Sequence, residues 1–361
     1  MPFCMHAVQS EKRKAGDIST ALLGAYQNNA RVLPWRVPPG EKAPLPDAYH
    51  VWLSEIMLQQ TTVAAVIPYF ERFTREWPNF AALAGADEAE VMAAWAGLGY
   101  YARARNLIAC AKMVVAEHGG RLPDNEAALL SLPGIGPYTA AAIAAIAFGQ
   151  RAVVVDANVE RVVSRLFAIA EPLPAAKPAI RAATEAITPK DRSGDFAQAM
   201  MDLGAGLCSV RAPRCHDCPI SRYCAAYLDG NPDAYPVKAA KKAKPARTGT
   251  AYWIDRGGNV WLPTREGKGM LGGMRALPDD RWRAGVDGDA APPFAANWRV
   301  LDTKVQHVFT HFTLSLNIAV TAGPDAAEMP MPGEYWPVNL LDKAGLPTLF
   351  SKAAKAVLTA N

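Results

Sequence analysis

The fold is decided by residues 125–150, which read NEAALLSLPGIGPYTAAAIAAIAFGQ. Two apolar helical segments flank the turn LPGIG, in which Gly134 and Gly136 let the backbone turn tightly and expose its amide groups. Such amides, together with the N-terminus of the following helix, can bind a DNA phosphate. The pattern therefore predicts a helix-hairpin-helix, with an ordinary turn between two helices as the alternative.

Two carboxylates on either side of this stretch form a candidate catalytic pair. Asp156 ends the apolar run VVVD at 153–156 and opens the next helix, where an aspartate commonly serves only as a cap. Glu55 lies in the helical segment VWLSEIMLQQ at 51–60, on a stripe of apolar residues, and burial there would raise the pKa of its carboxyl. A protonated glutamic acid beside an aspartate is a pair that cleaves glycosidic bonds. A glutamate that faces solvent is the alternative.

Four of the six cysteines are closely spaced. Cys208, Cys215, Cys218 and Cys224 follow the pattern C-x6-C-x2-C-x5-C, which can hold a zinc ion or a 4Fe-4S cluster. Because protein thiolates would fill all four positions, we expect a structural centre. The two remaining cysteines are interpreted as structural or incidental thiols.

The 361 residues suffice for two domains. After a polar leader at 1–17, residues 18–229 predict a mainly α domain that contains the hairpin and the cysteine loop at 208–224. Residues 249–361 predict a smaller α+β domain, with two strands around Gly257 and Gly258 and another strand over 309–320. Basic and acidic residues balance in each domain, so the net charge of +4 lies in the linker at 230–248, which we interpret as a basic strap along a duplex.

These motifs together resemble the helix-hairpin-helix DNA glycosylases that carry a 4Fe-4S cluster, and most closely the MutY type of adenine DNA glycosylase. The resemblance runs from about Leu33 to Phe312. It also rests on LPWR at 33–36, WLSEIMLQQT at 52–61, GLGYYARARN at 97–106 and AMMDLGA at 199–205. It implies a multidomain protein, with a helical glycosylase domain and a Nudix-like domain, that removes adenine opposite 8-oxoguanine or guanine from double-stranded DNA after flipping the base out.

The resemblance also implies roles for single residues. Glu55 would protonate the adenine, and Asp156, oriented by Asn158, would stabilise the positive sugar. The remaining implied DNA contacts are Leu33, Trp35 and Arg36 in the adenine pocket, Gln60 and Tyr100 as wedges in the base stack, Gly134 and Gly136 in the hairpin, and Arg103 and Arg105 at phosphates.

Two positions separate this chain from its relatives. Endonuclease III enzymes carry a lysine that forms a Schiff base where this chain has Tyr138, so the resemblance implies a glycosylase without efficient strand-nicking lyase activity. In the Nudix-like domain the family has Phe-Ser-His where this chain has Phe309, Thr310 and His311, which would read 8-oxoguanine. The sequence contains no glutamate-rich Nudix box, which argues against nucleotide hydrolysis.

Two other functions stay open. One is a glycosylase for another lesion, such as thymine opposite guanine, and the other is a catalytically silent DNA-binding or redox-sensing iron-sulfur protein. We expect a monomer in the cytoplasm without a membrane partner, because no apolar run is long enough to span a bilayer and the N-terminus lacks a signal sequence.

Overall fold

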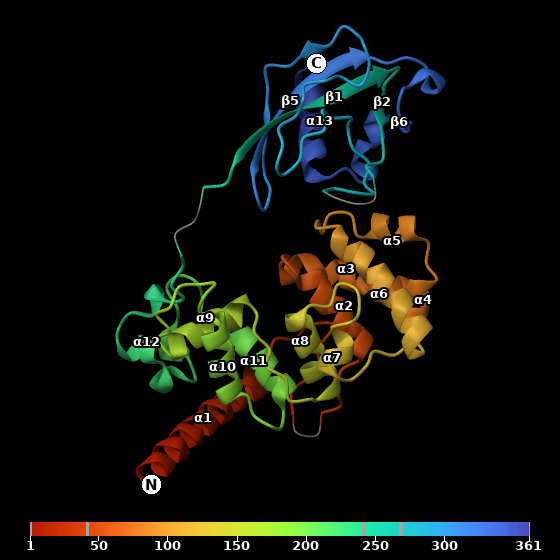
Figure 1. Ribbon diagram of the computed structural model, residues 1–361. Helices are drawn as coiled ribbons and strands as arrows, with labels where there is room; N and C mark the ends of the chain where they lie inside the picture. The colour runs from red at the N-terminus through yellow and green to blue at the C-terminus, as the bar shows by residue number, and fades with distance from the viewer. Residues whose placement is uncertain (1, 41–42, 240–242, 267–269, 361) are drawn as a thin grey trace. The chain divides into compact units, whose positions relative to one another are not determined.

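The computed structural model describes residues 2–40, 43–239, 243–266 and 270–360, with side chains described from residue 15. The chain divides into two compact units, Met1–Ala240 and Lys241–Asn361 (Figure 1). The division falls inside the segment 230–248 that the sequence predicts as a linker. No helix among the described residues is long and apolar enough to cross a membrane.

The first unit is built from helices. They are α1 (Pro2–Asn29), α2 (Ala48–Leu58), α3 (Val63–Glu76), α4 (Phe80–Ala84), α5 (Glu88–Ala94), α6 (Ala102–His118), α7 (Glu126–Leu129), α8 (Pro137–Phe148), α9 (Ala157–Leu166), α10 (Lys177–Ile187), α11 (Ser193–Gly206) and α12 (Ala225–Leu228), with short 3-10 turns η1 (Cys215–Asp217), η2 (Ser221–Tyr223) and η3 (Pro232–Ala234). Helix α1 continues without a break through position 17, where the polar leader was predicted to end.

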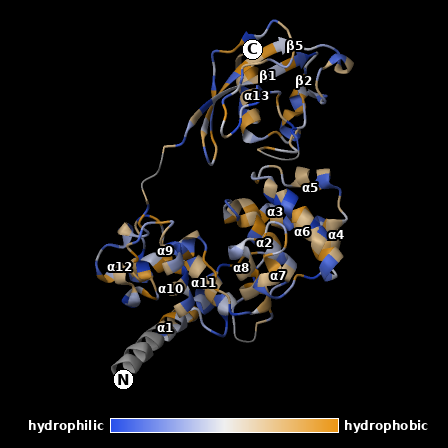
Figure 2. Ribbon diagram, in the orientation of Figure 1, coloured by the Kyte–Doolittle hydropathy of each residue, from blue (hydrophilic) through white to orange (hydrophobic). Residues whose placement is uncertain are grey.

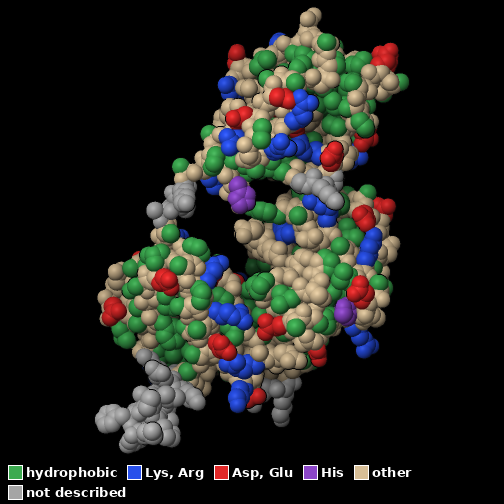
Figure 3. Space-filling view, viewed as in Figure 1, with side chains coloured by type: hydrophobic (Ala, Val, Ile, Leu, Met, Phe, Trp, Pro, Cys, Tyr) green, Lys and Arg blue, Asp and Glu red, His purple; other side chains and the backbone are tan. Residues whose placement is uncertain are grey.

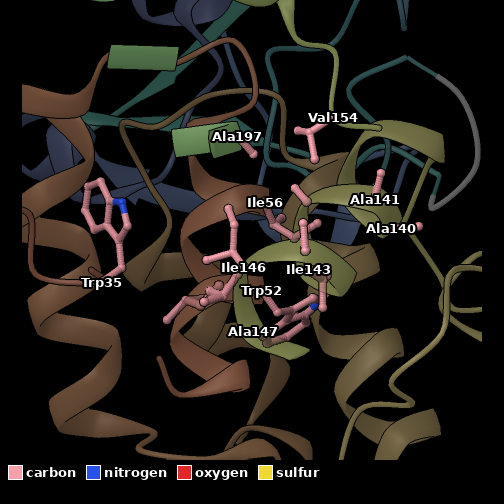
Figure 4. Close-up of a cluster of buried hydrophobic side chains, with 14 of the residues drawn as sticks. Trp35, Trp52, Ile56, Ala140, Ala141, Ile143, Ile146, Ala147, Val154 and Ala197 are labelled. Carbon is pink, nitrogen blue, oxygen red and sulfur yellow. The ribbon is translucent and has the colours of Figure 1, made fainter. Parts of the chain in front are cut away.

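Helix α8 lies at the centre of this unit. Nine of its twelve residues are buried, and most are alanines, so α2 and α11 can pack closely against it. Figure 4 shows Trp35, Trp52 and Ile56 in the same core as the α8 residues Ile143 and Ile146. In Figure 2 the helices around α8 carry both hydrophobic and hydrophilic residues, as helices with one buried face do.

The predicted helix-hairpin-helix is confirmed. Helix α7 leads through residues 130–136 into α8, whose N-cap is Gly136. Gly134 has a positive φ of 77°, and a Cβ there would lie 2.7 Å from the Cβ of Asn106 on α6. Only glycine satisfies both conditions, so this residue lets the hairpin approach α6 closely.

The second unit is a mixed sheet with one long helix, as the α+β prediction requires. Its strands are β1 (Ala246–Arg256), β2 (Asn259–Leu262), β3 (Arg299–Val300), β4 (Val305–Val308), β5 (Thr313–Ala322) and β6 (Glu334–Pro337), followed by α13 (Thr348–Ala360), with 3-10 turns η4 (Ala326–Glu328) and η5 (Val338–Lys343). The sheet order is β3-β5-β1-β2-β6, with β4 also paired to β5. Strands β1 and β5 run parallel, and the other pairs run antiparallel. The apolar face of α13 packs on this sheet.

The strand predicted over 309–320 is partly wrong. Residues 309–312 form the turn between β4 and β5, closed by a hydrogen bond from the Phe309 N–H to the Phe312 carbonyl, and β5 begins at Thr313. The two aromatic rings of this turn stack with centroids 4.6 Å apart, so they pack against each other without a strand at these positions.

Both ends of the predicted linker are bound to a unit. The Leu173 N–H donates to the Val237 carbonyl and the Ala239 N–H donates to the Leu173 carbonyl, while β1 already begins at Ala246. Lys241 and Lys242 lie outside the described residues. On the face shown in Figure 3, basic and acidic side chains are interspersed over each unit, in line with their balanced charges.

Candidate active site

A pocket of about 630 Å³ opens in the first unit. It brings together eight residues singled out from the sequence, which come from the segment before α2, from α2 and the turn after it, and from the N-terminal ends of α8 and α9. They are Leu33, Trp35, Arg36, Glu55, Gln60, Tyr138, Asp156 and Asn158. Gly134 and Gly136 lie in the hairpin, outside the lining of this pocket.

Glu55 is the buried acid of this pocket. Its position on α2 leaves the residue 6% exposed among apolar neighbours, as the sequence predicts. The pKa of the carboxyl is raised to about 7, mainly by burial and also by the charge of Asp156, although a hydrogen bond with Tyr138 and the charge of Arg36 oppose this rise. Glu55 therefore holds a proton in a substantial fraction of molecules at neutral pH.

Asp156 is the second carboxylate. It caps α9 by accepting from the Val159 N–H at 2.7 Å, and its other oxygen accepts from the Asn158 side-chain amide at 2.9 Å. The capping interpretation is thus correct, yet the side chain also lines the pocket that contains Glu55. Capping and catalysis do not exclude each other, because the capping bond holds the carboxylate in place at the N-terminal end of α9.

An ion pair missed by sequence reasoning lies beside Glu55. Asp202 on α11 accepts from Arg31 Nε at 2.6 Å and from Arg36 Nη1 at 2.8 Å, and both arginines line the pocket. The side chains of Arg36 and Asp202 are 8% and 12% exposed, so this pair is shielded from solvent. The motif MMDL contains Asp202, but its distance of 166 residues from Arg36 hid the contact.

The two predicted wedge residues lie on separate turns, one after α2 and one before α6. Gln60 follows α2, is exposed and lines the pocket, whereas Tyr100 precedes α6, is 58% exposed and lies outside the pocket lining. Both have a left-handed backbone, with φ of 59° and 49° respectively. The phosphate contact expected for Arg103 is wrong, because this side chain is buried and donates its hydrogen bonds to the protein.

The four spaced cysteines line one small pocket. Arg165, which is 2% exposed, donates to Cys208 Sγ at 3.2 Å and supplies the positive charge that a group of thiolates requires. The donor set, four thiols beside a buried arginine, therefore fits a group that is bound by four thiolates.

A buried arginine connects this cysteine loop to the pocket. Arg161 donates to the Cys208 carbonyl at 2.8 Å and to Asn158 Oδ1 at 2.9 Å, and Asn158 in turn donates to Asp156. Gly204 makes room for this arrangement, because a Cβ there would lie 2.6 Å from the Cβ of Asn158. The cysteine loop therefore supports the position of Asp156.

The second unit has an opening of its own. Phe309, Thr310 and His311 line a space of about 480 Å³ together with Met270 and Arg283. Lys244, expected to lie in the basic strap, donates to the Phe309 carbonyl at 2.7 Å. The tripeptide predicted to read 8-oxoguanine is thus presented on a turn at a surface opening.

Comparison with known proteins identifies the family. The HhH-GPD superfamily of base excision DNA repair proteins matches residues 53–189, and a NUDIX domain matches 249–356. The human adenine DNA glycosylase is 33% identical in a match that covers 88% of this chain and 69% of the human protein. The chain belongs to the MutY-type adenine DNA glycosylases. Within this family it is also 39% identical to the Mycobacterium tuberculosis protein, over 64% of this chain and 73% of that protein.

Other matches cover a smaller share of the relative or of this chain. An adenine DNA glycosylase of Arabidopsis thaliana is 39% identical over 298 residues, but the match spans only 47% of its length. A solved thermostable thymine-DNA glycosylase, 31% identical, superposes with a TM-score of 0.53 over 60% of this MutY-type chain and 98% of its own. An endonuclease III–DNA covalent intermediate, 21% identical, superposes with a TM-score of 0.51 over 61% of this chain and 98% of its own. At this identity the match shows only that the two proteins share a fold.

Proposed function

We propose that the protein hydrolyses the N-glycosidic bond of adenine mispaired with 8-oxoguanine or guanine in double-stranded DNA. The observation that carries this proposal is that Glu55, a buried acid with a pKa of about 7, shares one pocket with the carboxylate of Asp156. The protonated acid can deliver a proton to the leaving base, and the carboxylate can stabilise the positive sugar. The adenine DNA glycosylase relatives support adenine as the base.

The steps are divided among the residues of the pocket. Leu33, Trp35 and Arg36 hold the flipped adenine, and Gln60 and Tyr100 enter the space that it leaves. Glu55 protonates the ring so that adenine leaves as a neutral molecule, and then accepts a proton from the attacking water. Asn158 keeps the Asp156 carboxylate directed at the sugar, as its 2.9 Å hydrogen bond allows. Phe309, Thr310 and His311 read the opposite 8-oxoguanine.

A panel of duplexes that differ only in the mispair tests this function. Under single-turnover conditions, excision should be fastest for adenine opposite 8-oxoguanine and slower opposite guanine. Release of thymine opposite guanine would favour the alternative suggested by the thymine-DNA glycosylase match, which leaves about two fifths of this chain without a counterpart. Binding without any base release would favour the silent DNA-binding protein.

We expect the enzyme to be monofunctional. A lyase needs an amine that forms a Schiff base with the sugar, and the chain presents Tyr138, whose pKa burial raises well above its usual value. Borohydride added during the reaction should therefore trap little covalent protein–DNA adduct. An endonuclease III enzyme assayed in parallel is the positive control, and trapping at its level would contradict the prediction.

We infer that Cys208, Cys215, Cys218 and Cys224 hold a 4Fe-4S cluster. Purified protein should absorb visible light and contain iron, and Cys218→Ser should lose most of both and unfold at a lower temperature. Cys110→Ser is the control, because Cys110 is also a free thiol but lies on α6, away from this group. Colourless protein with stoichiometric zinc would contradict the cluster.

Asp202→Asn should shift the pH dependence of excision. Asp202 neutralises Arg31 and Arg36, and the charge of Arg36 lowers the pKa of Glu55. Without this carboxylate the effect of Arg36 grows, the pKa of Glu55 falls below about 7, and the rate should decline at a lower pH than in the wild type.

Single-turnover rates measured across neutral pH check this shift. Asp195→Asn is the control, since Asp195 lies on the same helix and pairs with Arg192 outside the pocket. An unchanged profile in Asp202→Asn would mean that the ion pair only fixes structure.

A further inference from the structure

Arg103 is a buried cation for which the chemistry proposed above has no use. It lies in the first turn of α6 and is 7% exposed, although the flanking Tyr100 is largely in solvent. Burial lowers the pKa of its guanidinium to about 10, so the group stays charged at neutral pH. A buried charge needs several hydrogen-bond partners, and the partners of Arg103 show which segments of the protein it connects.

One nitrogen of Arg103 binds the end of α2. Nη1 donates to the Ile56 carbonyl at 3.0 Å and to the Met57 carbonyl at 2.8 Å, in the last turn of the helix that carries Glu55. The Ile56 carbonyl also accepts from the Gln59 N–H at 3.4 Å, and the carbonyls of the last turn carry the partial negative charge of the helix, so a guanidinium is a favourable cap.

The second terminal nitrogen, Nη2, joins two separate turns. Nη2 donates to Thr61 Oγ1 at 3.0 Å, next to Gln60, and also to the Leu98 carbonyl at 3.0 Å and the Gly99 carbonyl at 3.3 Å, next to Tyr100. Both wedge candidates have positive φ values, which cost energy in residues other than glycine and persist only where surrounding contacts impose them. The guanidinium of Arg103 supplies contacts both to the turn that contains Gln60 and to the turn that contains Tyr100.

The same group also touches an aromatic wedge candidate directly. Its central carbon lies 5.6 Å from the ring centroid of Tyr100 and 5.2 Å from that of Trp95, and the Trp95 indole N–H donates to the Gly99 carbonyl. The exposed phenol ring of Tyr100 therefore packs on a buried, charged guanidinium. Lysine cannot replace this arrangement, because its ammonium lacks the planar fork that reaches carbonyls on both turns.

We propose that Arg103 is a positioning residue for base flipping, which sets the separation of Gln60 and Tyr100 so that both enter the base stack together. This inference rests on the proposed glycosylase function. It assigns to Arg103 a role between two protein segments and not at a phosphate. The α2 cap joins the wedge pair to the helix of Glu55, so that extrusion of the base and placement of the acid depend on one side chain.

The experiment separates flipping from chemistry and from folding. A duplex carries the adenine mispair with 2-aminopurine next to the adenine, and its fluorescence rises when the neighbouring base is unstacked. With wild-type protein we expect a rise in fluorescence followed by excision. With Arg103→Lys the rise and the single-turnover rate should both fall by about tenfold or more, while affinity for the duplex changes by less than about threefold.

A milder pair of variants keeps the test valid if Arg103→Lys is unstable. Thr61→Ala removes the contact on the Gln60 side alone and should reduce the fluorescence rise, whereas Thr61→Ser keeps the hydroxyl and should restore it. Arg72→Lys, at an exposed ion pair on α3, controls for the loss of any arginine.

The contrary outcomes are distinct. An unchanged fluorescence rise in Arg103→Lys and Thr61→Ala overturns the inference, as does weaker binding of every duplex with a shallower salt dependence, which would indicate a phosphate contact. Wild-type protein that excises no adenine would instead overturn the proposed function.

Discussion

Glu55→Gln should lower the single-turnover rate of adenine excision by about 10²–10⁴-fold, the usual contribution of a general acid. Glutamine has nearly the same shape and fits the site on α2, but it has no acidic proton to give to the base. Binding of the mispaired duplex should change little, so the loss should appear in the rate at saturating protein. Rapid-quench measurement of released adenine gives this rate directly.

The pH dependence of the wild type gives a second test of the same residue. The acid form of Glu55 is the active one, and its pKa is raised to about 7 by burial. The rate should therefore be high below this pH and decline as the pH rises through it. Glu71→Gln, at an exposed position on α3, should keep both the rate and the profile. A wild-type rate that increases through neutral pH would show that Glu55 acts as a base in the slow step.

Local patterns predicted much of the fold and the burial of Glu55. The helix-hairpin-helix depends on glycines a few residues apart, and the position of Glu55 among apolar residues depends on the helical repeat alone. The α+β unit was likewise visible in alternating apolar residues around Gly257 and Gly258. Such features arise from contacts near in sequence, which a single chain reveals.

What the sequence could not reveal are contacts between distant residues. Arg103 looks like a surface arginine because its partners at Ile56 and Thr61 lie 47 and 42 positions away. Asp202 is likewise joined to Arg36 only by packing of α11 against the segment before α2. Buried polar side chains are decided by which groups need partners in the finished core, and no local periodicity encodes that requirement.

The strand prediction for residues 309–312 was wrong for a different reason. Apolar and polar residues alternate from Phe312 onward, as in a strand, but the preceding FTHF does not continue this alternation, and Phe309 and Phe312 stack on each other and close a hydrogen-bonded turn. Both conformations can bury these rings, so the choice depends on where β4 and β5 pair. The outcome places Thr310 and His311 at an opening, where the proposed reading of 8-oxoguanine needs them.

Asp156→Asn should lower excision by about 10²–10³-fold without destabilising the protein. Asparagine caps a helix as well as aspartate does, so the bond from the Val159 N–H is kept while the negative charge is lost. The stabilisation of the positive sugar disappears, and so does the bond from the Asn158 side-chain amide, because the new amide nitrogen cannot accept it. Thermal unfolding and single-turnover excision, measured on the same preparation, separate these two functions.

The chain offers a matched control for this substitution. Asp87 caps α5 through bonds from the Ala89 and Glu90 N–H groups and does not line the pocket. Asp87→Asn should leave both the unfolding temperature and the excision rate unchanged, whereas Asp156→Ala should lose about 1 kcal/mol of stability as well as activity. Full activity in Asp156→Asn would mean that this aspartate is a cap and nothing more, and that the positive sugar is stabilised by another group in the pocket. Glu160, one turn further along α9 and also in the pocket lining, would then be the carboxylate to replace next.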